Sequence, residues 1–170
     1  MHRITGLVLA ASLGVLTAVA SDIEKLPDSL QEFTMQLVGY GDFKRWGFHI
    51  YDVSYWQNGG DTRALKIIYR KNISSDRLIK STLSEWGKVG TAAVDQQLLW
   101  ADQLSKIWPD VSPGDSLIAV VAETHTEFTD GAGKTLGRVD DATFGQQFLD
   151  IWLHPDSSAG RLRDELLGQR

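Results

Sequence analysis

Four polar side chains between residues 45 and 55 could together hold a small ligand. Arg45 supplies a cation, His49 an imidazole, and Tyr51 and Tyr55 supply phenols, within a segment, 39–56, that has seven aromatic residues among eighteen. If this segment continues as one strand, these odd-numbered side chains share a face, because successive residues point to opposite faces. Such an amphipathic face suits an apolar molecule with an acidic or phenolic end. We predict all four as ligand-binding residues; the alternative is a solvated sheet face with half-exposed tyrosines.

The even-numbered side chains of the same strand are more apolar. They include Trp46, Phe48, Ile50 and Trp56. We expect this face to pack beneath helices, while the odd-numbered face lines a sheltered hollow.

Other chemistries find little support in the residue types. The chain has no cysteine, which excludes disulfides, thiol nucleophiles and thiolate metal sites. His49, His125 and His154 lack the i, i+3 or i, i+4 spacing of helical metal ligands, so no metal or other cofactor is expected. The run Gly131–Thr135 resembles the end of a phosphate-binding loop, but Phe128 stands where that loop needs its first glycine. A hairpin turn explains these glycines better.

The overall charge is acidic. The formal net charge is −5, from 17 basic and 22 acidic residues, and no run of basic residues is present. This composition argues against nucleic acid and against anionic membrane surfaces as partners.

The first twenty residues have the pattern of a signal peptide. His2 and Arg3 precede an apolar run over residues 4–19, which ends in the small-residue pattern Ala18-Val19-Ala20. We expect cleavage after Ala20, export to the periplasm or secretion, no integral membrane segment after cleavage, and one domain over residues 21–170. A transmembrane anchor is the alternative, although the run is short and interrupted by polar residues and glycine.

The order of expected elements indicates an α+β fold. Strands are predicted over residues 33–38, 44–56 and 63–70. Two amphipathic helices follow: one begins at Ser74 or Ser75, and the other spans 92–108. Next come a buried strand over 117–122 and a glycine hairpin that joins 127–128 to 136–139. Two more helices follow: one begins at Asp140 or Asp141, and the last spans 158–167. Without βαβ alternation, these elements predict an antiparallel sheet with helices packed on one face.

The helix over 92–108 has one expected inward face. Its members are Val94, Leu98, Ala101, Leu104 and Trp108. Trp100 lies off this face and is therefore a candidate for an exposed tryptophan.

Three segments together resemble the bacterial chalcone-isomerase-like family of exported proteins. They are Gly39-Tyr-Gly with the aromatic strand FHIYDVSYW, the glycine hairpin leading into LGRVDDATFGQQFLDIWL, and the closing SSAGRLRDELLG. The resemblance implies an open-faced β-sandwich with a cleft between sheet and helices. Plant chalcone isomerases close a flavanone ring in this cleft, and related proteins of the fold bind fatty acids there.

Both uses of the cleft require an arginine that holds an anionic oxygen, and here the chain departs from the pattern. In exported relatives with Gly-x-Gly-x-Arg, the arginine would fall on Phe43, whereas Arg45 follows two residues later with the same strand parity. Tyr51 would lie near a threonine position of the plant enzymes. The shifted cation weighs against isomerisation more than against binding, because stabilising a developing charge depends on donor placement, while apolar burial is not directional.

Three functions are therefore weighed. The preferred one is a non-catalytic exported protein that binds a hydrophobic, fatty-acid-like small molecule, with Arg45 at the acidic end and the hydroxyls of Tyr51 and Tyr55 as donors. An intramolecular lyase acting on a chalcone-like enone, with Tyr51 and Arg45 polarising the carbonyl, is the enzymatic alternative. A structural or interaction protein of the envelope, using exposed tryptophans, is the third.

Overall fold

Six antiparallel strands form the centre of the structure, a computed structural model that describes residues 22–169. Neighbours in the sheet follow the chain order. The strands are β1 (Gln36–Arg45), β2 (Phe48–Gln57), β3 (Arg63–Tyr69), β4 (Ser116–Val121), β5 (Thr126–Asp130) and β6 (Thr135–Val139). The predicted signal peptide, residues 1–20, lies outside the described residues.

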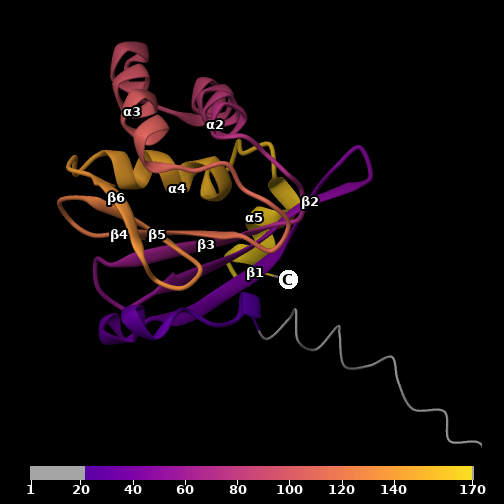
Figure 1. Ribbon diagram of the computed structural model, residues 1–170, viewed down its shortest axis with the longest axis vertical. Helices are drawn as coiled ribbons and strands as arrows, with labels where there is room; N and C mark the ends of the chain where they lie inside the picture. The colour runs from indigo at the N-terminus through magenta and orange to yellow at the C-terminus, as the bar shows by residue number, and fades with distance from the viewer. Residues whose placement is uncertain (1–21, 170) are drawn as a thin grey trace, which may run out of the picture.

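Four helices lie on one side of this sheet (Figure 1). They are α2 (Ser75–Val89), α3 (Val94–Ile107), α4 (Phe144–Leu153) and α5 (Gly160–Leu166). α2 packs against α3 and α4, and α5 packs across β1. The α+β prediction, with an antiparallel sheet backed by helices, is confirmed.

Aromatic side chains fill much of the core between the sheet and the helices. Trp86 of α2, Trp100 of α3 and Phe144 of α4 meet edge to face, with ring centroids 5.5–6.0 Å apart. Phe128 of β5 extends this cluster towards Phe148. These rings bury large apolar surfaces, which a chain without disulfides needs for stability.

The prediction of one strand over 44–56 was wrong, because a tight turn at Trp46 and Gly47 divides the segment. Both residues have positive φ, at 51° and 80°, as a two-residue hairpin turn with right-handed strand twist requires. Glycine adopts this conformation freely, whereas a tryptophan rarely does. Arg45 therefore ends β1, while His49, Tyr51 and Tyr55 belong to β2.

The prediction that the helices cover the even-numbered face of this strand was also wrong. Val53 and Tyr55, on the odd-numbered face, are buried beneath the helices. Trp56 is buried on the opposite face, in a second cluster that includes Leu30. Alternation shows that the two faces differ, but it does not show which one the helices cover.

An N-terminal segment covers that second face. It contains the 3-10 helix η1 (Asp28–Phe33), whose last residue was predicted to begin the first strand. Lys66 of β3 reaches this segment with its side chain and is 3% exposed. Its Nζ donates to the carbonyl oxygens of Asp22 (2.7 Å) and Lys25 (3.0 Å).

The inward face of α3 differs from the prediction in part. Ala101 and Leu104 are buried as expected, but Val94 and Leu98 are exposed and Trp100 is buried. The Trp100 indole packs on aromatic neighbours, and its Nε1 donates to Asp141 (3.0 Å). The large ring therefore decides the rotation of the helix.

Two glycines let α5 approach β1 closely. A side chain at Gly39 would overlap the main-chain carbonyl oxygen of Glu165, and one at Gly41 would overlap the side chains of Glu165 and Leu162. The Gly-Tyr-Gly motif thus serves helix packing in this structure.

Candidate functional site

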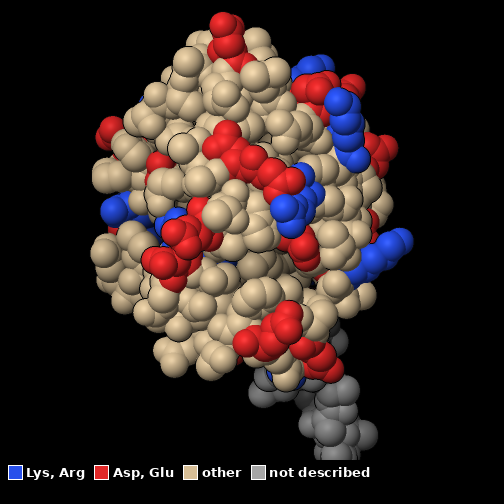
Figure 2. Space-filling model, turned by 90° about the vertical axis from the view of Figure 1, so that its left-hand side faces the viewer, with Lys and Arg blue, Asp and Glu red and all other residues tan. Residues whose placement is uncertain are grey.

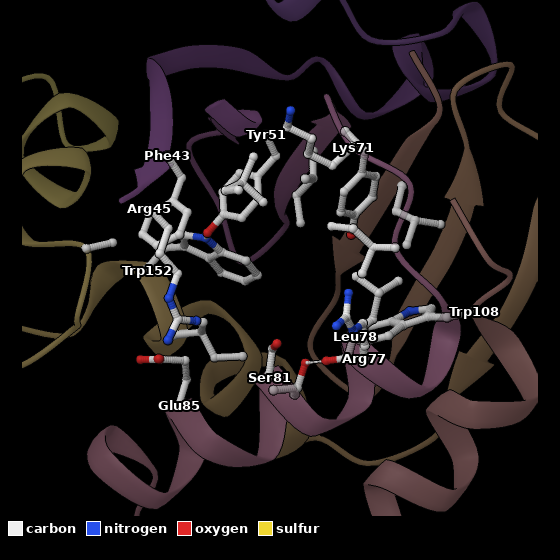
Figure 3. Close-up of a pocket in the computed structure, with 18 of the residues that line it drawn as sticks. Phe43, Arg45, Tyr51, Lys71, Arg77, Leu78, Ser81, Glu85, Trp108 and Trp152 are labelled. Carbon is white, nitrogen blue, oxygen red and sulfur yellow. Dashed lines mark hydrogen bonds between the residues drawn. The ribbon is translucent and has the colours of Figure 1, made fainter. Parts of the chain in front are cut away.

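A cavity of about 680 Å³ lies between the sheet and α2, bordered also by residues of α4. This volume falls within the range of about 300–1,000 Å³ that is typical of small-molecule sites. Figure 3 shows its lining, with Tyr51 and Phe43 of the sheet opposite Leu78, Ser81 and Glu85 of α2.

The interior of the cavity is apolar. Its sheet side is formed by Leu65, Ile67, Leu117, Ala119 and Phe128, and Phe148, Ile151 and Trp152 of α4 contribute further apolar surface. An apolar ligand would gain roughly 25 cal/mol for each Å² of surface buried here.

Two tyrosines add polar groups to this interior. Tyr51 lies over Tyr69 edge to face, and its hydroxyl accepts a hydrogen bond from Nε1 of Trp152 (3.0 Å). Burial raises the pKa of both tyrosines well above the ordinary value of a phenol. Both hydroxyls therefore stay protonated at neutral pH and can donate to an oxygen of a ligand.

Four exposed cations line the cavity towards solvent: Arg45, Lys71, Arg77 and Lys80. No ion pair between described residues involves any of them. In Figure 3 Arg45 lies at one side of the cavity, near Glu85, and Arg77 at the other.

Glu85 is the acidic group of the lining, and a lysine already neutralises it in part. Its Oε1 accepts from Nζ of Lys88 (2.8 Å), whereas its Oε2 is buried and has no hydrogen-bond partner among the described residues. The lining therefore combines an apolar interior with an excess of positive charge at its edge.

Comparison with known proteins identifies the fold. No family model matches the chain. A protein of Haemophilus influenzae described as uncharacterized is 28% identical over 142 residues, which is 79% of this chain and 68% of that one. Among solved structures, the crystal structure of a fatty-acid binding protein of Arabidopsis thaliana matches with a TM-score of 0.63 and 9% identity, over 86% of this chain and 90% of that chain.

The chain has the chalcone-isomerase fold. Within this fold, Phe43 occupies the position where the sequence analysis placed the arginine of exported relatives. Its ring stacks on Tyr51, with centroids 5.0 Å apart and planes at 12°. The wall of the cavity is therefore aromatic at this position, and Arg45 lines the cavity from the end of β1.

The structure brings two of the four predicted ligand-binding residues to the cavity. Arg45 and Tyr51 line it. His49 lies outside the lining, and its Nε2 is 2.8 Å from Asp52, which also pairs with Arg70.

Tyr55 also lies outside the lining. It is 2% exposed within the core beneath the helices, and its hydroxyl accepts from Nε2 of Gln57 (2.7 Å). Ligand binding by any of the four residues stays a prediction.

Sequence reasoning missed several lining residues. Tyr69 and Trp152 lie in a predicted strand and a predicted helix, and neither they nor Lys71, Arg77 and Lys80 were predicted to bind a ligand. One signal was present: residues 77 and 80 lie three apart on one helix, so both side chains project from similar sides of it. That α2 and the end of the first hairpin line the same cavity could not be inferred from periodicity.

Two structural features are absent from the described residues, 22–169. No helix among them is both long and apolar enough to cross a membrane. No three of their His, Asp or Glu side chains converge as a metal site would require.

Proposed function

We propose that this protein binds a hydrophobic molecule with an acidic end, such as a fatty acid, and does not transform it. One observation carries the proposal: an apolar cavity is edged by four exposed cations, none of which forms an ion pair among the described residues, in a chain whose net charge is −5. A ligand with an acyl chain inside and a carboxylate at the edge matches this gradient. The fatty-acid binding protein of Arabidopsis thaliana, which shares the fold, adds support.

The states of the tyrosines favour binding over proton transfer. A general base near neutral pH needs a pKa close to the working pH. Burial instead moves the pKa of Tyr51 and Tyr69 upwards, and Tyr51 already accepts a bond from Trp152. Both tyrosines suit the role of neutral donors to a ligand oxygen.

A titration of delipidated protein tests the proposal. The ligands are a long-chain fatty acid, the alcohol of the same length and the matching alkylamine, measured by calorimetry and by thermal shift. We expect the acid to bind best and the amine worst. In Arg45→Ala and Arg77→Ala, the Kd for the acid should rise about two- to fivefold for each cation, because an exposed ion pair contributes about 0.5–1 kcal/mol.

Two controls make this titration decisive. The affinity for the alcohol should not change in either variant, because its head carries no charge. Lys106→Ala, on the outer side of α3 and paired with Asp102 (2.7 Å), should not change the affinity for the acid. Binding of none of the three ligands, or equal binding of acid and amine, would refute the proposal.

The enzymatic alternative rests on Arg45 and Tyr51, which line the same cavity (Figure 3). An intramolecular lyase would use them to polarise the carbonyl of a chalcone-like enone. The absorbance of a chalcone decides between the two functions. Turnover that disappears in Arg45→Ala and in Tyr51→Phe would favour the enzyme.

We further propose that the chain is exported and belongs to the bacterial chalcone-isomerase-like family. The resemblance of the three sequence segments and the shared fold support family membership. The pattern of residues 1–20 supports export. Fractionation of cells, with mass spectrometry of the mature N-terminus, tests cleavage after Ala20.

A further inference from the structure

Two aromatic side chains stand exposed at the end of the β1–β2 hairpin. Trp46 is 85% exposed and Phe48 is 61% exposed. Figure 1 shows this hairpin end, in purple, projecting beyond the rest of the sheet. We call residues 44–48 the hairpin tip.

The backbone at this tip is strained for the residue that occupies it. Trp46 has a φ of 51°, a region where bulky residues are rare and which costs of order 1–3 kcal/mol for a residue other than glycine. A tryptophan at this position gains little burial in return. Packing within the fold therefore does not explain this tryptophan, whereas contact of its exposed ring with another molecule would.

Cations accompany both rings. The guanidinium of Arg45 lies 4.6 Å from the ring centroid of Trp46, and Nζ of Lys71 lies 5.4 Å from that of Phe48. Arg77 and Lys80 of α2 line the same cavity as these rings.

The carboxylates near the tip are mostly neutralised by other partners. Asp42 pairs with Lys44 and Arg161, and Asp52 pairs with Arg70. The tip and the start of α2 thus carry an excess of positive charge, with Asp76 as a further acidic group of that helix.

The face turned away from the tip has the opposite character. Figure 2 views the molecule from the side of α3 and β6, and acidic side chains predominate there. The acidic composition argues against an anionic partner for the molecule as a whole, but the fold segregates the charges.

We propose that the hairpin tip docks on the surface of an anionic lipid bilayer, with Trp46 and Phe48 inserted at the headgroup level. Tryptophan and other aromatic rings favour this interface, and basic side chains near it are attracted to anionic headgroups. Arg45, Lys71 and Lys80 would then lie against lipid phosphates.

A protein partner fits this tip less well than a bilayer does. Two aromatic rings bury about 150–250 Å² each, whereas a stable protein interface needs about 800 Å² per partner. A bilayer accepts a small insertion that many surrounding charges support.

Docking would also place the cavity next to the membrane surface. Trp46, Phe48 and Arg45 belong to its lining, so the bound tip would turn this side of the cavity towards the lipid. Docking itself does not need an occupied cavity, so its failure would leave the ligand proposal standing.

Sedimentation with vesicles tests the docking. The vesicles consist of phosphatidylcholine alone or of phosphatidylcholine mixed with phosphatidylglycerol. We expect binding to the mixed vesicles, weakened by added salt, and little binding to the neutral ones. Trp46→Ser with Phe48→Ser should abolish binding, and Lys71→Glu with Lys80→Glu should weaken it by at least about tenfold, since each cation near the surface contributes about a factor of five.

Matched variants on α3 and at remote lysines provide the controls. Leu98 and Leu99 are exposed to 52% and 59%, so Leu98→Ser with Leu99→Ser removes a similar apolar surface elsewhere. Lys106→Glu with Lys134→Glu makes the same change of charge away from the tip. Absence of binding to the mixed vesicles, or equal losses in the tip and control variants, would overturn the proposal.

Discussion

At the scale of single residues, the glycines of β1 determine how closely the last helix can lie on the sheet. The main-chain oxygens of Glu165 and Leu166 occupy the space where a side chain at Gly39 would extend. Main-chain atoms of a packed helix cannot move aside as a flexible side chain can. The spacing of Gly39 and Gly41 therefore has a packing reason, independent of any ligand.

Substitution of Gly39 tests this packing directly. Gly39→Ala should lower the free energy of unfolding by about 1–3 kcal/mol, the usual cost of overpacking. Gly87→Ala is the matched control, because a side chain at this exposed position of α2 meets nothing within 4 Å. It should raise the free energy of unfolding by about 0.5–1 kcal/mol through helix propensity. Urea denaturation measures both changes, and equal effects of the two variants would contradict the packing argument.

The stacked pair of Phe43 and Tyr51 shows how the residue type at position 43 determines where the charge of the site lies. A cation at residue 43 would lie within the aromatic wall, whereas the four cations of the cavity lining lie towards solvent. The phenols of Tyr51 and Tyr69 add neutral polar groups to the interior. This separation suits a ligand whose charged end stays near water.

At the scale of elements, the N-terminal segment is joined to the sheet by a buried lysine. Lys66 donates to two carbonyl oxygens of that segment, and Asp22 supplies a carboxylate oxygen at 3.3 Å. Hydrogen bonds that involve a charged group contribute about 1.5–3 kcal/mol each. Lys66 therefore joins the start of this segment to the sheet, beside the apolar contacts of Leu30.

Lys66→Met retains the apolar stem and removes these bonds. Amide hydrogen exchange over residues 22–35 should become about ten- to a hundredfold faster, because local opening costs less by about 1.5–3 kcal/mol. Exchange in β4 and β5 should change little. Lys88→Met, which removes an exposed lysine paired with Glu85, should leave residues 22–35 unchanged. Unaltered exchange in the Lys66 variant would show that apolar contacts alone hold the segment.

The order of the elements could be predicted from the sequence, because the periods of two and 3.6 residues are strong along this chain. Ser74 or Ser75 was predicted to cap α2, and it is Ser74 whose Oγ accepts from the main-chain nitrogen of Arg77 (3.4 Å). The glycine hairpin of Gly131–Thr135 is also confirmed, with Oδ1 of Asp130 accepting from Ala132 and Lys134.

The candidate site could be predicted only in part. Arg45 and Tyr51 were predicted for it and line the cavity, but a reason given for Arg45, its place on the same strand as Tyr51, was wrong. A turn with tryptophan at positive φ has no signature in composition. The side of the sheet that the helices cover depends on contacts between distant segments, such as η1 against β3 and β4, and local patterns do not encode these.

At the scale of the whole molecule, the two faces of the sheet differ in how tightly they are packed. The outer face carries the small cluster of Leu30, Trp56 and Ile118, whereas the face beneath α2 borders the cavity. Ala119 and Val120 are neighbours on β4, and they point to these two sides.

Replacing these two neighbours by phenylalanine should therefore affect different properties: ligand binding for Ala119 and stability for Val120. Ala119→Phe places a ring in the cavity, so it should abolish fatty-acid binding and change the free energy of unfolding by less than about 1 kcal/mol. Val120→Phe overfills a packed cluster and should lower the free energy of unfolding by about 1–3 kcal/mol. Displacement of a fluorescent fatty acid and thermal denaturation measure the two quantities. A large loss of stability in Ala119→Phe would mean that the cavity does not accept added volume.

The position of α2 has a thermodynamic meaning. Trp86 and Val89 anchor its second half in the core, but Leu78 and Ser81 of its first half face the cavity. Leu78 also packs in part against the core, and a ligand in the cavity would add contacts to this half of the helix. Ligand binding in the cavity and the stability of this half of α2 would then be thermodynamically linked. A change that loosens the first turns of α2 would weaken ligand binding, and a change that stiffens them would slow ligand release.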